Sequence, residues 1–103
     1  MTPVARRFDG LAWRRVAGVE VPVAGRFSIR ALGLAHLCRA DAGPGLLIPG
    51  CRCVHTFGMR FELDLLFLDQ AGRVIRCARA VPRRRVLFER RANAVLELPA
   101  GLV

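Results

Sequence analysis

The chain has 103 residues, of which 53% are hydrophobic, so it is long enough for one modest core and too apolar for a disordered protein. Its formal net charge is +9 and all 17 basic residues are arginine, which is compatible with a polyanionic partner but is equally typical of a compositional bias. No apolar run approaches the ~20 residues needed to cross a bilayer, and we expect a cytoplasmic protein without a secretory leader or a membrane span.

The start of the chain predicts little regular structure before a first clear strand. Residues 1–17 are of mixed character and predict either a first strand or a loose arm, the arm covering residues 1–12. Alternating valines over residues 18–23 give a strand with one apolar face. Because Pro22 lacks a backbone donor, we expect this strand at the edge of a sheet.

One helix is predicted, over residues 28–37. Ser28 is placed to act as its N-cap, and apolar residues then recur near one face. Gly33 weakens a helix by about 1 kcal/mol relative to alanine, which a close contact with a sheet would explain. The sequence Asp-Ala-Gly-Pro-Gly over residues 41–45 ends the helix in a loop.

The rest of the chain predicts short strands separated by turns. The apolar run over residues 63–68 predicts a central strand, and the turn over residues 69–72 predicts a hairpin to its partner. The other predicted strands cover residues 46–48, 73–81, 86–88 and 94–98. The pattern favours a mainly β fold over residues 1–103: a single compact domain, β-sandwich or barrel-like, with one packed α-helix.

Two segments resemble a known family. GLLIPGCRCVHTFGMRFELDLLFLDQAGRVIR, over residues 45–76, and AVLELPAG, over residues 94–101, are similar to the signature of the domain of unknown function 192 family. The resemblance implies a compact mainly β domain with one packed helix, and it implies no activity, cofactor or catalytic residue. The sequence departs from that pattern at Glu62, where members often have proline, and relatives commonly continue beyond Gly101.

Four polar residues in or beside the apolar strands form the first candidate site: His55, Thr56, Arg60 and Asp64. Asp64 falls inside the most apolar strand, where an isolated charge costs several kcal/mol, so we expect Arg60 or His55 to be its partner. A His55–Asp64 pair in a cleft would supply a general base. A sealed network that pins this loop to the sheet is the alternative, and we favour it.

A second candidate is a metal site at Cys51, Cys53 and His55, which would point to one side of an extended strand. Cys38 or His36 would then be a fourth ligand. The spacing differs from C-x₂-C and no second pair follows, so buried reduced thiols are the favoured interpretation. We therefore expect neither a metal nor another cofactor.

The third candidate is a cluster of arginines at positions 83, 84, 85, 90 and 91. Such a cluster either binds a phosphate-bearing polyanion or forms a solvated loop. Aromatic residues suited to stacking are few, one tryptophan and six phenylalanines in the whole chain, which disfavours a platform for stacking nucleic-acid bases.

The residue inventory limits the chemistry further. Ser28 is the only serine and lysine is absent, which disfavours serine hydrolase, P-loop and Schiff-base mechanisms. The leading hypothesis is a non-catalytic ligand-binding or accessory domain for a small molecule or a protein. Its predicted site residues are His55, Thr56, Arg60, Asp64 and, as a weaker candidate, Glu97. The alternatives are a hydrolase-like enzyme using His55 and Asp64, with or without metal, and a polyanion or nucleic-acid binder through the arginines.

Overall fold

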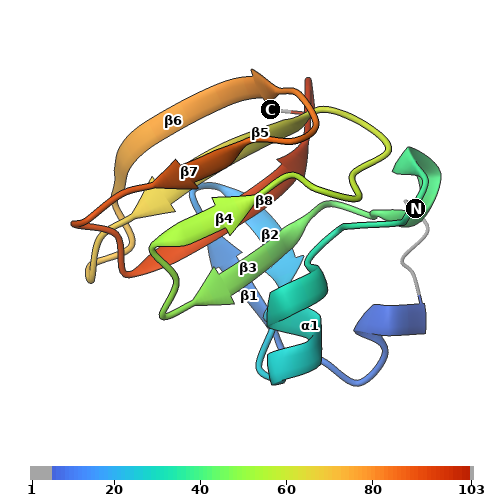
Figure 1. Cartoon of the computed structure of the whole chain (residues 1–103). Helices are drawn as coiled ribbons and strands as arrows, with labels where there is room; N and C mark the ends of the chain where they lie inside the picture. The colour runs from blue at the N-terminus through green and yellow to red at the C-terminus, as the bar shows by residue number, and fades with distance from the viewer. Residues whose placement is uncertain (1–5, 103) are drawn as a thin grey trace.

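The computed structural model describes residues 6–102 and, within them, every side chain except those of Phe27, Ser28 and Ala31. A four-stranded antiparallel sheet with the strand order β3-β8-β5-β6 lies at its centre (Figure 1). In sheet order these strands are β3 (Leu46–Pro49), β8 (Ala94–Pro99), β5 (Leu63–Leu68) and β6 (Val74–Val81). The mainly β architecture expected from the sequence is confirmed.

Two smaller antiparallel ribbons cover the two faces of this sheet. One pairs β1 (Trp13–Val16) with β2 (Val19–Pro22), and the other pairs β4 (Cys53–His55) with β7 (Val86–Phe88). In Figure 1 the β4–β7 ribbon crosses in front of the central sheet, and the β1–β2 ribbon lies behind it. The pairing of β4 with β7 was not expected, because the two strands are far apart in the sequence.

The apolar run of β5 is buried on both faces, as its composition predicted. Leu63, Leu65 and Phe67 belong to one core cluster, and Leu68 belongs to a second cluster on the opposite face. This alternation follows from the two-residue period of a strand. The strand lies between β8 and β6, so its central position is also confirmed.

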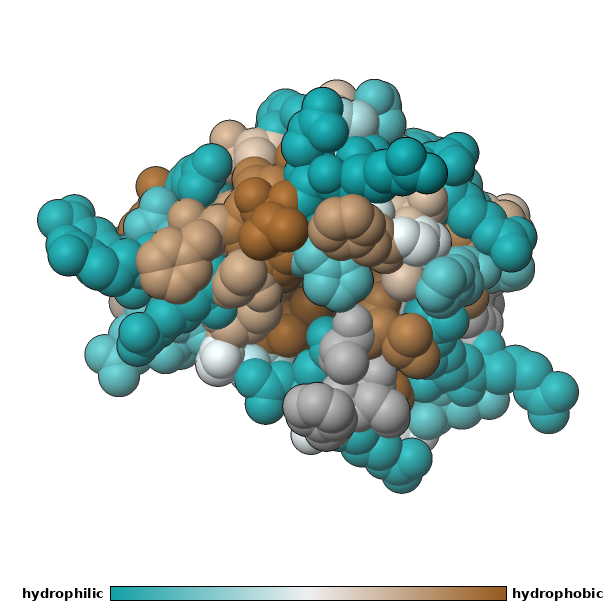
Figure 2. Space-filling view, in the orientation of Figure 1, coloured by the Kyte–Doolittle hydropathy of each residue, from teal (hydrophilic) through white to brown (hydrophobic). Residues whose placement is uncertain are grey.

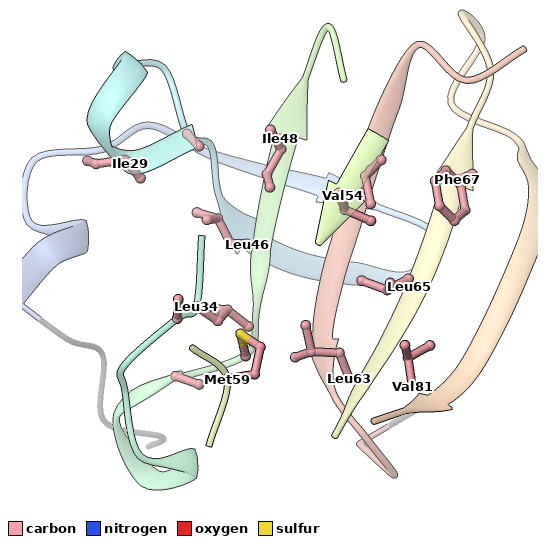
Figure 3. Packing of buried hydrophobic residues seen from close by; sticks show 14 of the residues in the cluster. Ile29, Leu34, Leu46, Ile48, Val54, Met59, Leu63, Leu65, Phe67 and Val81 are labelled. Carbon is pink, nitrogen blue, oxygen red and sulfur yellow. The ribbon is translucent and has the colours of Figure 1, made fainter. Parts of the chain in front are cut away.

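The larger core cluster lies on the side of α1 (Phe27–Leu32) and β4. Figure 3 shows its side chains converging from the helix, the ribbon and the central sheet. Ile29 comes from α1, Val54 from β4 and Met59 from the loop after it, and all three are buried with Leu46 and Leu65 of the central sheet. The face of the ribbon that does not join this cluster points outward.

The single packed helix expected over residues 28–37 is not borne out. The α-helical part of residues 6–102 is α1, six residues long, and two short 3₁₀ turns lie at Arg6–Phe8 and Arg39–Asp41. Arg26 is the N-cap, without a side-chain capping bond, so Ser28 does not have the expected role. Gly33, with a φ of 54°, turns the chain out of the helix.

The arm expected over residues 1–12 lies partly outside the described residues, which begin at residue 6. Within it, Phe8 is buried in the larger cluster. Arg7 donates hydrogen bonds to the carbonyl oxygens of Gly33 and Ala35, at 2.9 and 2.8 Å. Across residues 6–102, no helix is long and apolar enough to cross a membrane.

The two edge strands of the central sheet, β3 and β6, differ in what lies along their outer edges. Beside β3, the backbone N–H of Ala24 donates to the carbonyl of Leu47, and Val23 forms an isolated bridge with Leu47. At the other edge, the register of β6 shifts by one residue opposite Asp64, and Ala80 has a φ of 50°. This irregularity is a β-bulge, which bends the strand locally.

Candidate functional site

Asp64 is buried, as expected, but it has different partners from those the sequence suggested. Its Oδ1 accepts a hydrogen bond from the backbone N–H of Ala80 at 2.8 Å, and its Oδ2 accepts one from Gly101 at 3.2 Å. The cation is Arg79, whose guanidinium nitrogen lies 3.6 Å from Oδ2. The carboxylate therefore satisfies the bulge in β6 and ties the C-terminal turn to the sheet.

Thr56 is fully buried and joins two loops. Its hydroxyl donates to the carbonyl of Pro82 at 2.7 Å and accepts from the backbone N–H of Arg85 at 2.8 Å. Its backbone N–H also donates to the Arg85 carbonyl at 2.9 Å. With both polar functions of its side chain used inside the protein, Thr56 holds the 82–85 loop beside the end of β4.

His55 and Arg60 do not meet Asp64. Both side chains are exposed, and the imidazole of His55 contacts the ring of Phe57, with 5.9 Å between centroids. Within the described chain, no hydrogen bond or ion pair joins Asp64 to His55 or Arg60. The structure thus divides the predicted cluster and does not assemble the His–Asp pair that the hydrolase hypothesis requires.

The cysteines do not form a metal cluster. Among the residues that the structure describes, no three His, Cys, Asp or Glu side chains are placed to hold a metal ion. Cys51 precedes β4, and its Sγ donates to the carbonyl of Cys53 at 3.2 Å, whereas Cys38 donates to Asp41. Burial raises the pKa of the Cys51 thiol, which disfavours the reactive thiolate.

A pocket of about 280 Å³ lies between α1, β3, β4 and β8 and contains several of the predicted residues. Most of its walls are apolar, and they include Leu32, Ile48, Val54 and Met59. Its other described lining residues are Arg30, Gly33, Cys51, Cys53, His55 and Glu97. We refer to it as the Glu97 pocket.

Glu97 is the unusual group of this pocket, since it is 4% exposed and no cation pairs with it in residues 6–102. Its Oε1 accepts a hydrogen bond from the backbone N–H of Leu34 at 3.3 Å. Burial raises the pKa of Glu97 to about 7, and the Leu34 hydrogen bond offsets part of that rise. The carboxyl group therefore exists in both protonation states near neutral pH.

The second oxygen of Glu97 is open to the pocket. No described residue donates a hydrogen bond to Oε2, and no fully buried side-chain oxygen or nitrogen in the described part of the chain lacks a partner. Oε2 therefore retains some exposed surface, and Glu97 is one of the residues that line the pocket. A mostly apolar cavity with a few polar groups is typical of small-molecule sites.

Gly33 explains how this acid fits beneath the helix. A Cβ atom at position 33 would lie 2.5 Å from Oε1 of Glu97, closer than real Cβ contacts allow, and 3.2 Å from its Cδ. The close contact with the sheet that a glycine in the helix candidate indicated is therefore confirmed, and its partner is Glu97. The turn at Gly33 also frees the N–H of Leu34 from the helical ladder.

A second hollow, of about 420 Å³, is more open, and its lining has fewer polar side chains. Its described lining contains no acid, and its one charged side chain, Arg39, donates to the carbonyl of Ala100. The Glu97 pocket is thus the better candidate site. Sequence analysis named four of its members: Cys51, Cys53, His55 and Glu97. It missed Arg30, because nothing local indicates that this helical arginine lines the pocket and donates to the carbonyl of Gly50.

Comparison with known proteins decides the family. The model of the family DUF192, described as an uncharacterized ACR, matches residues 11–103. The chain belongs to the DUF192 family. This agrees with the resemblance found in residues 45–76 and 94–101. No curated protein matches the DUF192 chain at a significant level.

Two crystal structures share the fold of this DUF192 chain. A protein from Sinorhizobium meliloti 1021, described as a "putative transcription regulator", has a TM-score of 0.70 and 22% identity over 86% of this chain and 78% of its own. A protein of unknown function from Novosphingobium aromaticivorans DSM 12444 has a TM-score of 0.63 and 20% identity over 99% of this chain and 89% of its own. At such identities the likeness concerns the fold alone.

Proposed function

We propose that this DUF192 chain binds a small ligand in the Glu97 pocket and does not catalyse a reaction on it. The observation that carries the proposal is a buried carboxyl group with one accessible oxygen inside a mostly apolar cavity of about 280 Å³. That volume lies just below the usual range of about 300–1,000 Å³ for small-molecule sites. The predicted site near residues 55–64 is kept only in part, through His55 and Met59.

The lining suggests the chemistry of the ligand. An apolar body suits the walls, and a hydrogen-bonding group suits Oε2 of Glu97. Arg30 is exposed beside the pocket, where its guanidinium group can hold an anionic group. A small aromatic or aliphatic carboxylate meets these requirements.

Binding without catalysis is favoured by the state of the other polar groups. The raised pKa of Cys51 disfavours a thiolate nucleophile, and His55 has no carboxylate partner in the described chain. A general acid or base by itself does not make an enzyme, since a nucleophile or stabilising donors must accompany it. Glu97 is thus proposed to orient a ligand.

The test is a titration with benzoate and 4-hydroxybenzoate, followed by ¹H–¹⁵N NMR. We expect the amides of Gly33, Leu34 and His55 to shift. Affinity for these anions should fall about tenfold between pH 6 and pH 8, because the ionised Glu97 repels them. Glu97→Gln should remove this pH dependence, and Arg30→Gln should weaken binding at both pH values.

Arg14→Gln is the matched control, because Arg14 is an exposed arginine on β1, on the far side of the central sheet. It should bind both probes like the unmodified chain. Shifts spread over the surface without a cluster around Leu34, or equal weakening by Arg14→Gln and Arg30→Gln, would contradict the proposal.

A further inference from the structure

The outer face of the β4–β7 ribbon displays aromatic and apolar side chains that the core does not use. The antiparallel register places Cys53 opposite Phe88 and His55 opposite Val86, with all four side chains exposed. Phe88 is 59% exposed, and Phe57, 51% exposed, packs its ring against His55. Figure 2 shows hydrophobic residues gathered on this side of the molecule, with hydrophilic residues around them.

Exposed arginines flank this face at both ends. Arg52 precedes β4 and the 90–91 pair follows β7, so these arginines lie at the end that carries Phe88. The 83–85 triplet precedes β7 and lies at the end that carries His55. Arg76 of the neighbouring β6 donates to the carbonyl of Phe88 at 3.2 Å. Together these make seven guanidinium groups around one short ribbon.

None of these seven arginines forms an ion pair with a carboxylate in the described part of the chain. The acid nearest to them in sequence is Glu89, whose Oε2 accepts a hydrogen bond from the backbone N–H of Arg91. The face is therefore strongly cationic. Phe88 lies between Arg85 and Arg90 in the sequence, and the pairing of β4 with β7 adds His55 and the adjoining Phe57 to the same ribbon.

We propose that this ribbon face binds single-stranded nucleic acid. Exposed rings provide stacking surfaces for bases of any sequence, and arginines at both ends provide contacts for successive phosphates. Guanidinium groups also bind phosphate oxygens in a bidentate manner and stack on bases. An acidic protein segment would use the same charges but would leave the flat aromatic surface without a matching partner, so we favour the nucleic acid.

This surface is separate from the function proposed above, although Cys53 and His55 border both. Phe57 and Phe88 are absent from the described lining of the Glu97 pocket. Substitutions at these two positions consequently test the ribbon face alone, and Glu97→Gln serves as the reciprocal variant.

The experiment measures fluorescence anisotropy of labelled dodecamers of oligo(U) and oligo(dT). We expect both to bind, with an affinity that decreases as the salt concentration rises from about 50 to about 200 mM. Phe57→Ala and Phe88→Ala should each weaken binding about tenfold. The double substitution of Arg83 and Arg85 by Gln should lower the slope of log affinity against log salt by about 1 to 2. A preference for one dodecamer would identify RNA or DNA as the ligand.

Trp13→Ala is the matched aromatic control, because Trp13 is 48% exposed on β1, behind the central sheet. It and Glu97→Gln should bind like the unmodified chain. Three results would overturn the proposal: no binding at about 50 mM salt, binding that Phe57→Ala and Phe88→Ala leave unchanged, or displacement of the dodecamers by poly-glutamate at equal charge concentration. The last result would assign the face to an acidic protein partner.

Discussion

Asp64 and Glu97 are two buried carboxyl groups in neighbouring strands of one sheet, and their surroundings give them different roles. Asp64 accepts hydrogen bonds from two backbone N–H groups and pairs with Arg79, so its charge is compensated where it lies. Glu97 receives one hydrogen bond and faces an apolar pocket. The partners of Asp64 therefore stabilise the structure around it, whereas burial raises the pKa of Glu97.

The raised pKa of Glu97 predicts a pH-dependent stability. Because this pKa is about 7 in the folded protein and its ordinary value is 4.5, the folded state retains a proton that the unfolded chain releases between these values. The contribution of Glu97 to stability hence decreases as the pH rises from about 4.5 to about 7.

Glu97→Gln should remove this loss of stability with rising pH. We expect its free energy of unfolding to match that of the unmodified chain at pH 4 and to exceed it by about 3 kcal/mol at pH 8. Urea denaturation at several pH values measures the difference. A constant difference across this pH range would show that Glu97 has an ordinary pKa.

At the scale of elements, the glycine that ends the short helix α1 and the acid in β8 depend on each other. Gly33 gives the helix its early end, and the absence of a side chain there makes room for Glu97. The free N–H of Leu34 then becomes the donor for this acid. A longer helix over residues 28–37 would have kept that N–H in its own hydrogen-bond ladder.

Gly33→Ala should therefore destabilise the protein by about 2 kcal/mol or more, because it combines a positive φ with a collision against Oε1 of Glu97. The collision part should disappear when Glu97 is shortened. In a double-mutant cycle, Gly33→Ala should cost markedly less in the Glu97→Ala background, leaving mainly the backbone strain. If Gly33→Ala lowered the free energy of unfolding equally in both backgrounds, the two residues would not be in contact.

At the scale of the whole molecule, the excess of arginine should make stability depend on salt. The described residues contain three ion pairs against a formal net charge of +9, so repulsion between like charges outweighs attraction. Raising the salt concentration from about 10 to about 200 mM should raise the free energy of unfolding by roughly 1 kcal/mol, as screening weakens the repulsion. Urea denaturation measures this, and a decrease in stability would show that the ion pairs dominate.

Local patterns in the sequence predicted the strands well and their partners poorly. The run in β5 and the turn after it specified a central hairpin, because both signals involve adjacent residues. The contact of β4 with β7, and of Gly33 with Glu97, depends on residues more than 30 positions apart, which no local pattern records. Asp64 was placed in the interior correctly but given the wrong cation, because the register shift in β6 opposite Asp64 is not readable from a local pattern.

The two borders of the central sheet differ in how they discourage self-association. The chain itself shields β3, where Ala24 occupies the Leu47 carbonyl that a foreign strand would otherwise contact. Along β6, two features disfavour pairing with a second copy. The bulge at Ala80 interrupts the straight row of backbone donors. Arg76 and Arg79 would also lie near the arginines of the other copy in an edge-to-edge dimer and repel them. Extension of the sheet by a second copy of the chain is thus obstructed at both edges.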